Sequence, residues 1–257
     1  MPQNKKQVEI YTLQLSKEKL LNSPNVERNL FFLLGHLAND LLILNRLFLI
    51  TAQSTHIRDD SFVKRFNTAQ ALLIGKIITS KLHEGWELTK KLYFIKEVSQ
   101  KYDKVMPEPG KQALKALKRY FGKANIATSI RNEFGFHYPI NRIDKTIKNI
   151  NESEELLLYL SPASSNTLYY ACDLIPNHEM IHSIGEENMQ KSYDRLIDET
   201  AKCVKNFNDF IQNYMIAFIE SNDVLEGDAG DRPTITYKSA PKLKHFKMPS
   251  VFDQRGM

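Results

Sequence analysis

Residues 30–50 read LFFLLGHLANDLLILNRLFLI and form the most apolar stretch of the chain. Polar and charged residues interrupt it at intervals, namely His36, Asn39, Asp40, Asn45 and Arg46. A lipid bilayer would penalise these side chains heavily. The stretch is therefore predicted to be a buried helix of a protein bundle rather than a membrane span.

Helical spacing of apolar residues continues on both sides of this stretch. Ser23 and Pro24 stand where a cap and a first-turn proline begin a helix, which we expect to run to about residue 53. A polar break at 54–60 separates it from a second helix, predicted from about residue 61 to residue 99. Two long helices joined by a short link favour an antiparallel pair.

The remainder of the chain is also mainly helical in pattern. Pro107–Gly110 stops the second helix, and further helices are predicted over 111–122, about 124–136 and 186–221. Because these periodic segments dominate, we predict a mainly all-α fold. Its architecture is an up-and-down bundle of long helices that occupies residues 1–221.

Three segments depart from the helical period. Residues 8–15 alternate like a strand. Residues 155–175 favour a small β-hairpin, although the second half could instead begin a helix. Residues 222–257 have turn formers and prolines but no sustained period, so they are predicted to form a basic tail or strap. Its basic residues are Lys238, Lys242, Lys244, His245 and Lys247. Such tails more often pack over their own domain or stay mobile than contact RNA.

Composition limits the classes of function. A chain of 257 residues with 42% hydrophobic residues can bury a sizeable core as one large domain, with or without an appendage. The net charge of +5 permits an acidic partner such as RNA without requiring one. Two cysteines, Cys172 and Cys203, are too few for a disulfide scaffold, and no signal peptide is evident. A cytoplasmic location without membrane attachment is the default expectation.

The strongest functional pattern lies at residues 130–138, which read IRNEFGFHY. An arginine keeps its charge at physiological pH and an imidazole is a common acid or base, so Arg131 and His137 together offer fixed positive charge beside a candidate for proton transfer. Asn132 adds an uncharged donor and acceptor, while Phe134 and Phe136 are expected to anchor the segment in a core. This combination suits chemistry at a phosphate. The alternative interpretation is a surface arginine near a packed histidine.

The arrangement resembles the Arg-Asn-x(4)-His motif of the HEPN superfamily, whose members are helical bundles and in many cases metal-independent ribonucleases. Residues 41–48 and 81–88 look like the two long helices that precede the motif in larger bacterial HEPN-like proteins. The resemblance implies an HEPN-like bundle, no cofactor, and a homodimer whose motif helices face each other across one cleft. Asn39, Asp40 and Glu84 would line that cleft from behind, or else form hydrogen bonds between helices of the bundle.

The resemblance implies cleavage by attack of a ribose 2′-hydroxyl on the adjacent phosphate, which leaves a 2′,3′-cyclic phosphate. His137 is the candidate for proton transfer and Arg131 for neutralising charge on the phosphoryl oxygens, while Asn132 orients the phosphate or His137. Six positions place Arg131 and His137 about 120° apart around an ideal helix, not on one face. Because Tyr138 precedes Pro139, the helix is expected to end there, with the histidine out of register.

A run of basic residues precedes the motif. They are Lys111, Lys115, Lys118, Arg119 and Lys123, and no acidic residue lies between positions 109 and 132. The first three share one helix face opposite apolar residues, where they are candidates for holding an RNA backbone. Most basic helix faces are simply solvated, and that interpretation remains open.

A rival motif is His178-Glu179-x-x-His182, which fits the zinc pattern of two histidines one helical turn apart with a glutamate that activates water. Pro176 and Asn177 are expected to put the first histidine at a helix start, which is poor geometry for zinc. No third ligand is assigned, although Glu199 lies at a suggestive spacing.

Three classes of function therefore remain. They are an HEPN-type endoribonuclease, a non-catalytic HEPN-like module that binds RNA or a protein partner, and a zinc hydrolase. The resemblance also implies a toxin–antitoxin or phage-defence setting, with an antitoxin or defence protein as partner.

Overall fold

The computed structural model describes residues 8–54, 61–227, 234–237, 241–246, 248–251 and 253. About 72% of the described residues lie in helices, and the described strands form one two-stranded sheet. The prediction of a mainly all-α fold is confirmed. The predicted break at 54–60 lies, from residue 55 onward, outside the described residues.

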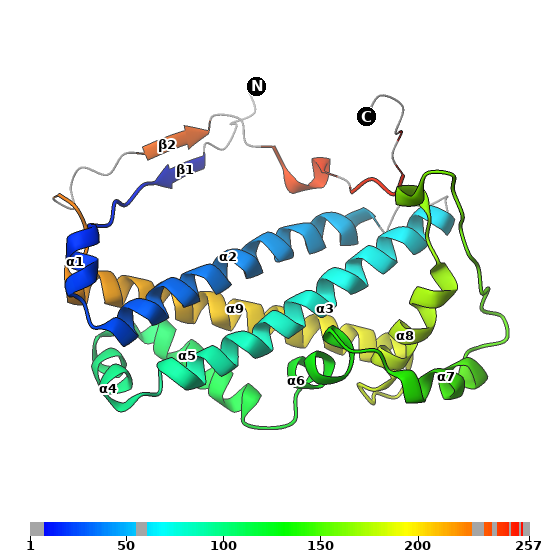
Figure 1. The fold of residues 1–257 in the computed structure, drawn as a ribbon, viewed down its shortest axis with the longest axis horizontal. Coiled ribbons are helices and arrows are strands. Elements are labelled where there is room, and N and C mark those ends of the chain that lie inside the picture. Colours follow the sequence, from blue (N-terminus) through cyan, green and yellow to red (C-terminus); the bar gives the residue numbers. More distant parts are fainter. Residues whose placement is uncertain are drawn as a thin grey trace, which may run out of the picture.

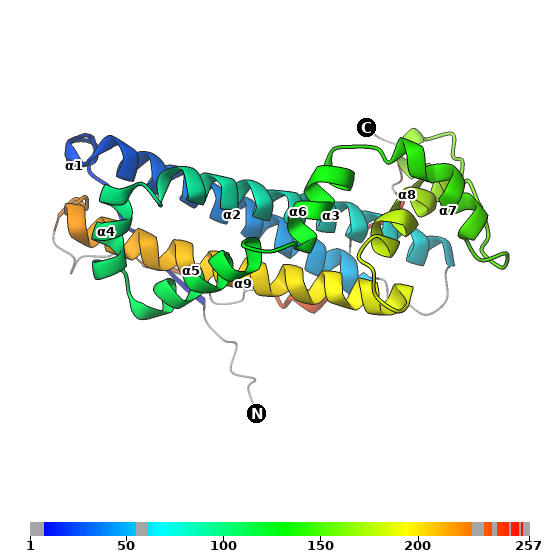
Figure 2. The same cartoon turned by 90° about the horizontal axis from the view of Figure 1, so that it is seen from below.

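Three long helices run lengthwise through the molecule (Figure 1), namely α2 (Asn25–Ser54), α3 (Ser61–Leu92) and α9 (Met189–Asn222). α2 begins directly after Pro24, as the start signal predicts. α2 and α3 are antiparallel neighbours, and α9 packs along both of them (Figures 1 and 2). The predicted pair is therefore confirmed, with α9 as its third partner.

The core is an aromatic and aliphatic cluster between these helices. α9 contributes Phe207, Phe210, Tyr214 and Phe218, each fully buried and spaced three or four residues apart, so that they share one side of the helix. α2 faces them with leucines at the same spacing, Leu30, Leu34, Leu37 and Leu41. The apolar residues that repeat at helical spacing in the sequence are thus the residues that are buried in the core.

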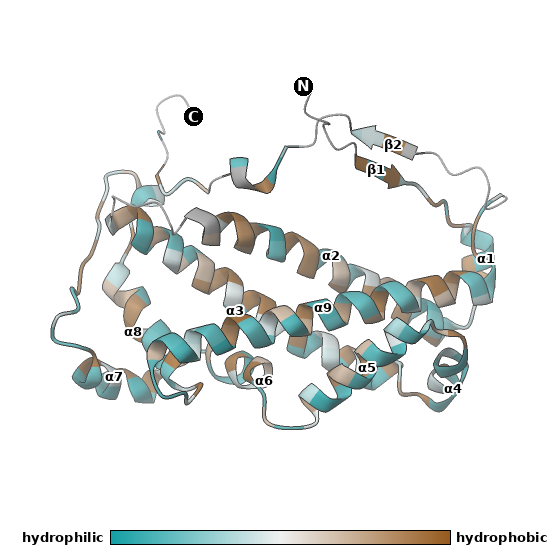
Figure 3. Ribbon diagram, turned by 180° about the vertical axis from the view of Figure 1, so that it is seen from behind, coloured by the Kyte–Doolittle hydropathy of each residue, from teal (hydrophilic) through white to brown (hydrophobic). Residues whose placement is uncertain are grey.

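α2 presents only one side to this core. Phe32, Leu33 and Ile43 on its other side are between 45% and 55% exposed, and the helix shows apolar residues along most of its length (Figure 3). Among the described residues, it is the one helix whose length and composition would allow a membrane crossing; 17% of the relevant window is buried inside the protein. The prediction of a buried helix therefore holds for one side, and the cytoplasmic location stays a prediction.

The second long helix is shorter than predicted. α3 ends at Leu92, and α4 (Lys96–Val105) begins after a turn at residues 93–95. The hydroxyl of Tyr93, a fully buried residue, donates to Asp103 at 2.9 Å, and Phe94 packs edge-on against Trp86. The packing of the Tyr93 and Phe94 rings turns the chain at this point. The helical spacing of apolar residues does not predict such a turn.

A buried carboxylate joins three helices near one end of the bundle. Glu27 of α2 is 6% exposed, and its Oε2 accepts hydrogen bonds from Lys101 Nζ and Tyr102 Oη of α4, each at 2.6 Å. Asn222 at the end of α9 donates to the same tyrosine oxygen at 3.3 Å. Burial raises the pKa of Tyr102, so its hydroxyl stays protonated and can donate to Glu27.

α5 (Glu108–Phe121) begins inside the segment predicted as a stop. α4 ends at Val105, and Pro109 lies in the first turn of α5, where a missing N–H breaks no helical hydrogen bond. Ala113, Leu114 and Leu117 are buried, and α5 packs against α9. The proline-rich segment is therefore a junction between two helices.

The predicted hairpin at 155–175 is reduced to a single bridge. Tyr159 and Leu168 exchange two backbone hydrogen bonds of 2.8 Å, after which α8 (Tyr170–His182) begins. Arg65 of α3 holds this segment by donating to Tyr159 Oη at 2.5 Å and to Glu155 at 2.6 Å. The short elements nearby are η2 (Ile140–Arg142), α7 (Ile143–Asn149) and η3 (Ser164–Asn166).

The two ends of the chain meet in the sheet. β1 (Val8–Tyr11) pairs antiparallel with β2 (Thr234–Tyr237), which confirms the first half of the predicted strand at 8–15. α1 (Lys17–Asn22) follows β1, and η4 (Leu243–His245) contacts α2, so the described parts of the tail include ordered elements. In the tail, Lys242 and His245 are exposed, whereas Lys238, Lys247 and the side chain of Lys244 lie outside the described residues.

The contact between α2 and α3 gives a first prediction. A Cβ added at Gly85 would lie 2.4 Å from Leu37 Cδ2, whereas one added at Gly75 on the same helix would meet only Phe48, at 3.9 Å. Gly85→Ala should therefore lower the free energy of unfolding by about 1–3 kcal/mol through overpacking. Gly75→Ala is the matched control and should raise it by up to about 1 kcal/mol through helix propensity. Urea unfolding measures both, and equal effects would contradict the close approach.

Candidate active site

The motif segment forms two consecutive helical pieces instead of the single helix predicted over 124–136. Asn125 caps α6 (Ile126–Ile130), accepting the Thr128 N–H at 2.8 Å, and a π-helical turn, η1 (Arg131–Gly135), follows directly. Hydrogen bonds from i to i+5 make a π-turn wider than an α-turn, and such turns occur frequently at functional sites. The 120° separation expected for an ideal helix therefore does not apply.

Packing against α3 sets the position of the π-turn. Phe134 is 6% exposed and belongs to a small core with Ile130, Met180 and Leu196. A Cβ added at Gly135 would lie 2.2 Å from Ser80 Oγ, so only glycine allows this approach to α3. Phe134 is thus an anchor as predicted, but Phe136 is 70% exposed, and the prediction that it anchors the segment is wrong.

Arg131 is held at the surface by two neighbours. Its Nε donates to Glu84 Oε1 on α3 at 2.8 Å, and its Nη1 donates to Asn132 Oδ1 at 3.1 Å. The side chains of Arg131 and Glu84 are 38% and 51% exposed. An ion pair this exposed contributes little stability and exchanges readily with solvent or another anion. The guanidinium is therefore oriented but accessible.

His137 lies beyond the end of the π-turn, out of helical register as expected. It is exposed and lines a cavity of about 350 Å³ between η1, α3 and α8. Tyr138, which is 86% exposed, lines the same cavity. Arg131 and Asn132 are not among its lining residues. The structure of the single chain therefore does not place the arginine and the histidine in a common cavity.

Three residues of this cavity escaped the sequence analysis. Lys76 of α3 and Asp173 and Asn177 of α8 line it together with His137. Burial lowers the pKa of Lys76 and raises that of Asp173, and each charge partly offsets the effect on the other. The sequence does mark Lys76 as unusual, because it is the single lysine within the apolar run of residues 71–78. Only the fold shows that it faces Asp173.

A buried amide adds to the polarity of the cavity. Asn177 is 5% exposed, and its Oδ1 has no hydrogen-bond partner among the described residues. No ion pair within 4.0 Å joins Lys76 to a described carboxylate. A cation, an anion and a free acceptor therefore line one cavity beside a histidine, an arrangement typical of ligand sites.

The residues predicted to support the cleft separate into two places. Glu84 contacts Arg131, and Asp40 accepts from Lys81 Nζ at 2.7 Å. Because Lys81 and Glu84 are one turn apart on α3, these two ion pairs are neighbours. Asn39 instead lines a groove between α2 and α9. Asp40 thus forms a contact between two helices of the bundle, whereas the contact of Glu84 with Arg131 agrees with either interpretation.

The basic helix face is present on α5 and the turn after it. Lys115, Lys118, Arg119 and Lys123 are exposed, and none of them has an ion pair with a described carboxylate. The Lys118 ammonium lies 4.4 Å above the Phe94 ring, and Lys111 donates to the Lys104 carbonyl at 3.2 Å. α5 and α6 follow one another along the same edge of the bundle (Figure 1).

The His178-Glu179-x-x-His182 segment lies within a helix, which suits zinc better than the sequence predicted. The described residues offer no third ligand beside the two histidines. α8 starts at Tyr170 and contains Pro176, so His178 lies inside a helix, and the prediction of a helix start is wrong. Glu179 accepts a hydrogen bond from the Thr146 hydroxyl at 2.8 Å and forms an ion pair with Arg142 at 3.5 Å. Glu199 forms an ion pair with Arg195. Among the described residues no cluster of three potential ligands occurs. The residues present therefore do not fit a zinc centre.

The contact below the π-turn gives a second prediction. Gly135→Ala should destabilise the protein by about 1–3 kcal/mol, because the new methyl group collides with Ser80 Oγ. Ser80→Ala removes that oxygen and leaves Cβ at 3.5 Å, so the double variant should recover most of the loss. A double-mutant cycle from urea unfolding measures the coupling. Additive effects would show that the two residues do not meet.

Comparisons with known proteins found no match: no protein-family model fits the chain, and neither a curated protein nor a solved structure matches it. The function of the site is therefore inferred from its own residues and geometry.

Proposed function

We propose that the protein is a metal-independent endoribonuclease of HEPN type, with Arg131, Asn132 and His137 as its catalytic residues. The observation that carries the proposal is the anchoring of this segment. Buried Phe134 and the Gly135–Ser80 contact fix the π-turn, while Arg131 and Asn132 at its start and His137 beyond its end remain accessible. Fixed, accessible polar groups on a rigid element are what catalysis at a phosphate needs.

Each residue has a role that its surroundings support. Glu84 and Asn132 orient the guanidinium of Arg131, which would neutralise charge on the phosphoryl oxygens of the transition state. His137 is exposed and would transfer the proton between the 2′-hydroxyl and the leaving 5′-oxygen. Asn132 would orient the phosphate. The chemistry needs no metal.

The proposal includes a symmetric dimer. In one protomer His137 lines the cavity and Arg131 does not. A twofold axis that passes beside η1, between the two motif segments, would place the arginine of one protomer beside the histidine of the other, in keeping with the HEPN resemblance. The exposed cations of α5 would then hold the RNA on approach to the cleft. A toxin or defence role, with an antitoxin or defence protein as partner, stays a prediction.

A non-catalytic RNA-binding module is the second candidate. It is favoured by the position of Arg131 outside the cavity that His137 lines, because cleavage needs both groups at one phosphate. The two functions share the basic helix and differ in turnover, so cleavage assays separate them.

The third prediction concerns turnover. Cleavage of labelled single-stranded RNA in EDTA should fall by roughly two orders of magnitude or more in Arg131→Ala and in His137→Ala, because charge stabilisation and proton transfer are lost. Arg46→Ala and His36→Ala on α2 are matched controls that should retain activity. Cleavage that requires metal, or that persists in both motif variants, would refute the mechanism. Binding without cleavage would favour the second candidate.

The fourth prediction concerns affinity. Lys115→Ala combined with Lys118→Ala should weaken RNA binding and reduce the slope of log K against log salt by about one to two, because two phosphate contacts are removed. Turnover at saturating RNA should persist. Lys202→Ala with Lys205→Ala on α9 is the matched control, since both lysines already face aspartates. Titrations at several salt concentrations measure the slopes, and equal slopes in both double variants would contradict the proposed RNA path.

A further inference from the structure

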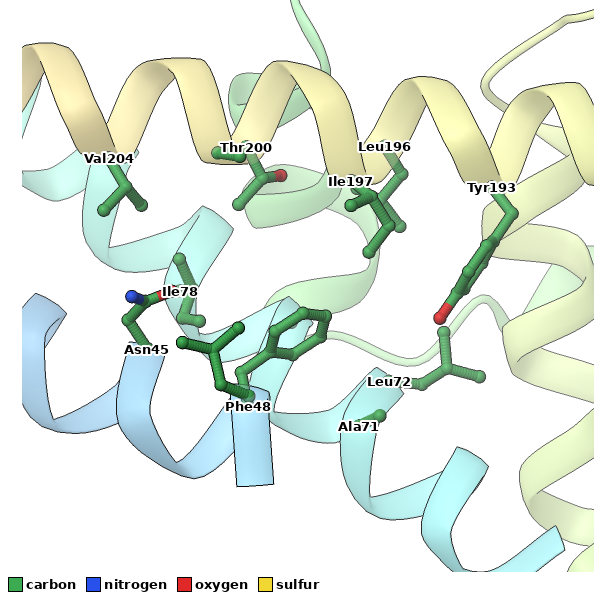
Figure 4. A pocket seen from close by; sticks show the side chains of 13 residues that line it. Asn45, Phe48, Ala71, Leu72, Ile78, Tyr193, Leu196, Ile197, Thr200 and Val204 are labelled. Atoms are coloured by element: carbon green, nitrogen blue, oxygen red, sulfur yellow. The ribbon is translucent and has the colours of Figure 1, made fainter. Parts of the chain in front are cut away.

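A second cavity, of about 160 Å³, lies between the C-terminal part of α2 and the N-terminal parts of α3 and α9 (Figure 4). Apolar side chains from the three helices face one another across it, among them Phe48, Leu72, Ile78, Leu196 and Val204. It is separate from the cavity beside His137, with which it shares no lining residue. Leu49, which is 39% exposed, and partly exposed Asn45 belong to its wall on α2 and mark a route to solvent.

One polar group in the wall of this cavity lacks a hydrogen-bond partner. Thr200 Oγ1 is buried, and it neither donates nor accepts a hydrogen bond among the described residues. Threonines elsewhere in α2 and α3 donate to the carbonyl four residues earlier, and they include Thr51, Thr68, Thr79 and Thr89. Thr200 does not donate to the carbonyl four residues before it. Its hydroxyl is left available to a molecule in the cavity.

Water is a poor occupant for such a space. A buried water needs two to four polar partners, and apolar cavities without them stay dry. Cavities of about 150 Å³ lined by leucine, isoleucine and phenylalanine instead bind molecules the size of benzene. The volume and the largely apolar lining here are close to that case, with the addition of the unpaired Thr200 hydroxyl and of the polar side chains of Asn45 and Tyr193 in the wall.

We propose that the cavity between α2, α3 and α9 is a binding site for a small uncharged single-ring aromatic molecule that carries one hydroxyl group. The ring would fill the space between Phe48, Leu72 and Leu196, and its hydroxyl would hydrogen-bond with Thr200. This site is independent of the proposed ribonuclease function. Because three helices form its walls, an occupied site stabilises the whole bundle.

The test compares two probes, toluene and 4-methylphenol, which differ by the hydroxyl. Isothermal titration and thermal unfolding should show 1:1 binding with a Kd of about 1 mM or tighter, and 4-methylphenol should bind more tightly. Thr200→Val should weaken 4-methylphenol binding by about 3–10-fold and leave toluene binding unchanged. Equal losses for both probes would show that Thr200 does not supply the hydrogen bond, and would overturn that part of the assignment.

Filling the cavity tests its location. Ala71→Leu places a larger side chain in the wall and should weaken both probes at least about 10-fold, whereas Ala124→Leu, at an exposed position outside the cavity, should not. If Ala71→Leu does not fold, Gly75→Ala decides, because its methyl group enters the same wall with only Phe48, at 3.9 Å, as a neighbour. No binding to the wild type, or undiminished binding to the folded filling variant, would overturn the proposal.

Discussion

The apolar stripe of α9 is the constraint on which the rest of the structure depends. Its buried residues run from Ser192 to Phe218 and contribute to both hydrophobic clusters of the described chain. α2 and α5 bury apolar faces against this helix, whereas α3 packs mainly against α2. The hydrophobic effect therefore selects a bundle with α9 along its length, and in the described part of the chain one side of α2 stays largely exposed.

α3 transmits this packing to the candidate active site. Over three turns it presents Gly75 and Ile78 to the apolar cavity, and Lys76 to the cavity beside His137. Ser80 meets Gly135, and Glu84 orients Arg131. A helix that is fixed on one side by α2 and α9 thus fixes the π-turn on the other. Precision at the motif comes from this rigid support rather than from the short segment itself.

Electrostatics divides the molecule into different functional regions. The Glu27 network is buried and structural, because its hydrogen bonds join α2, α4 and α9. The cations of α5 are exposed and unpaired by described carboxylates, and so are available to a polyanion. Lys76 and Asp173 lie between these extremes, since they are partly buried and face a cavity. Such intermediate sites are where ligands alter protonation most strongly.

The sequence by itself determined the long helices, their antiparallel pairing and the position of the motif, because apolar periodicity and capping residues act locally. It located Arg131, Asn132 and His137, and it placed Glu84 behind them, but it could not relate them to Lys76 or Asp173, which are distant along the chain. Only the tertiary structure decided that Tyr93 turns the chain, that Phe136 is exposed and that Pro176 lies within α8. These outcomes depend on contacts between residues far apart in sequence, and such contacts leave no period in the amino-acid order.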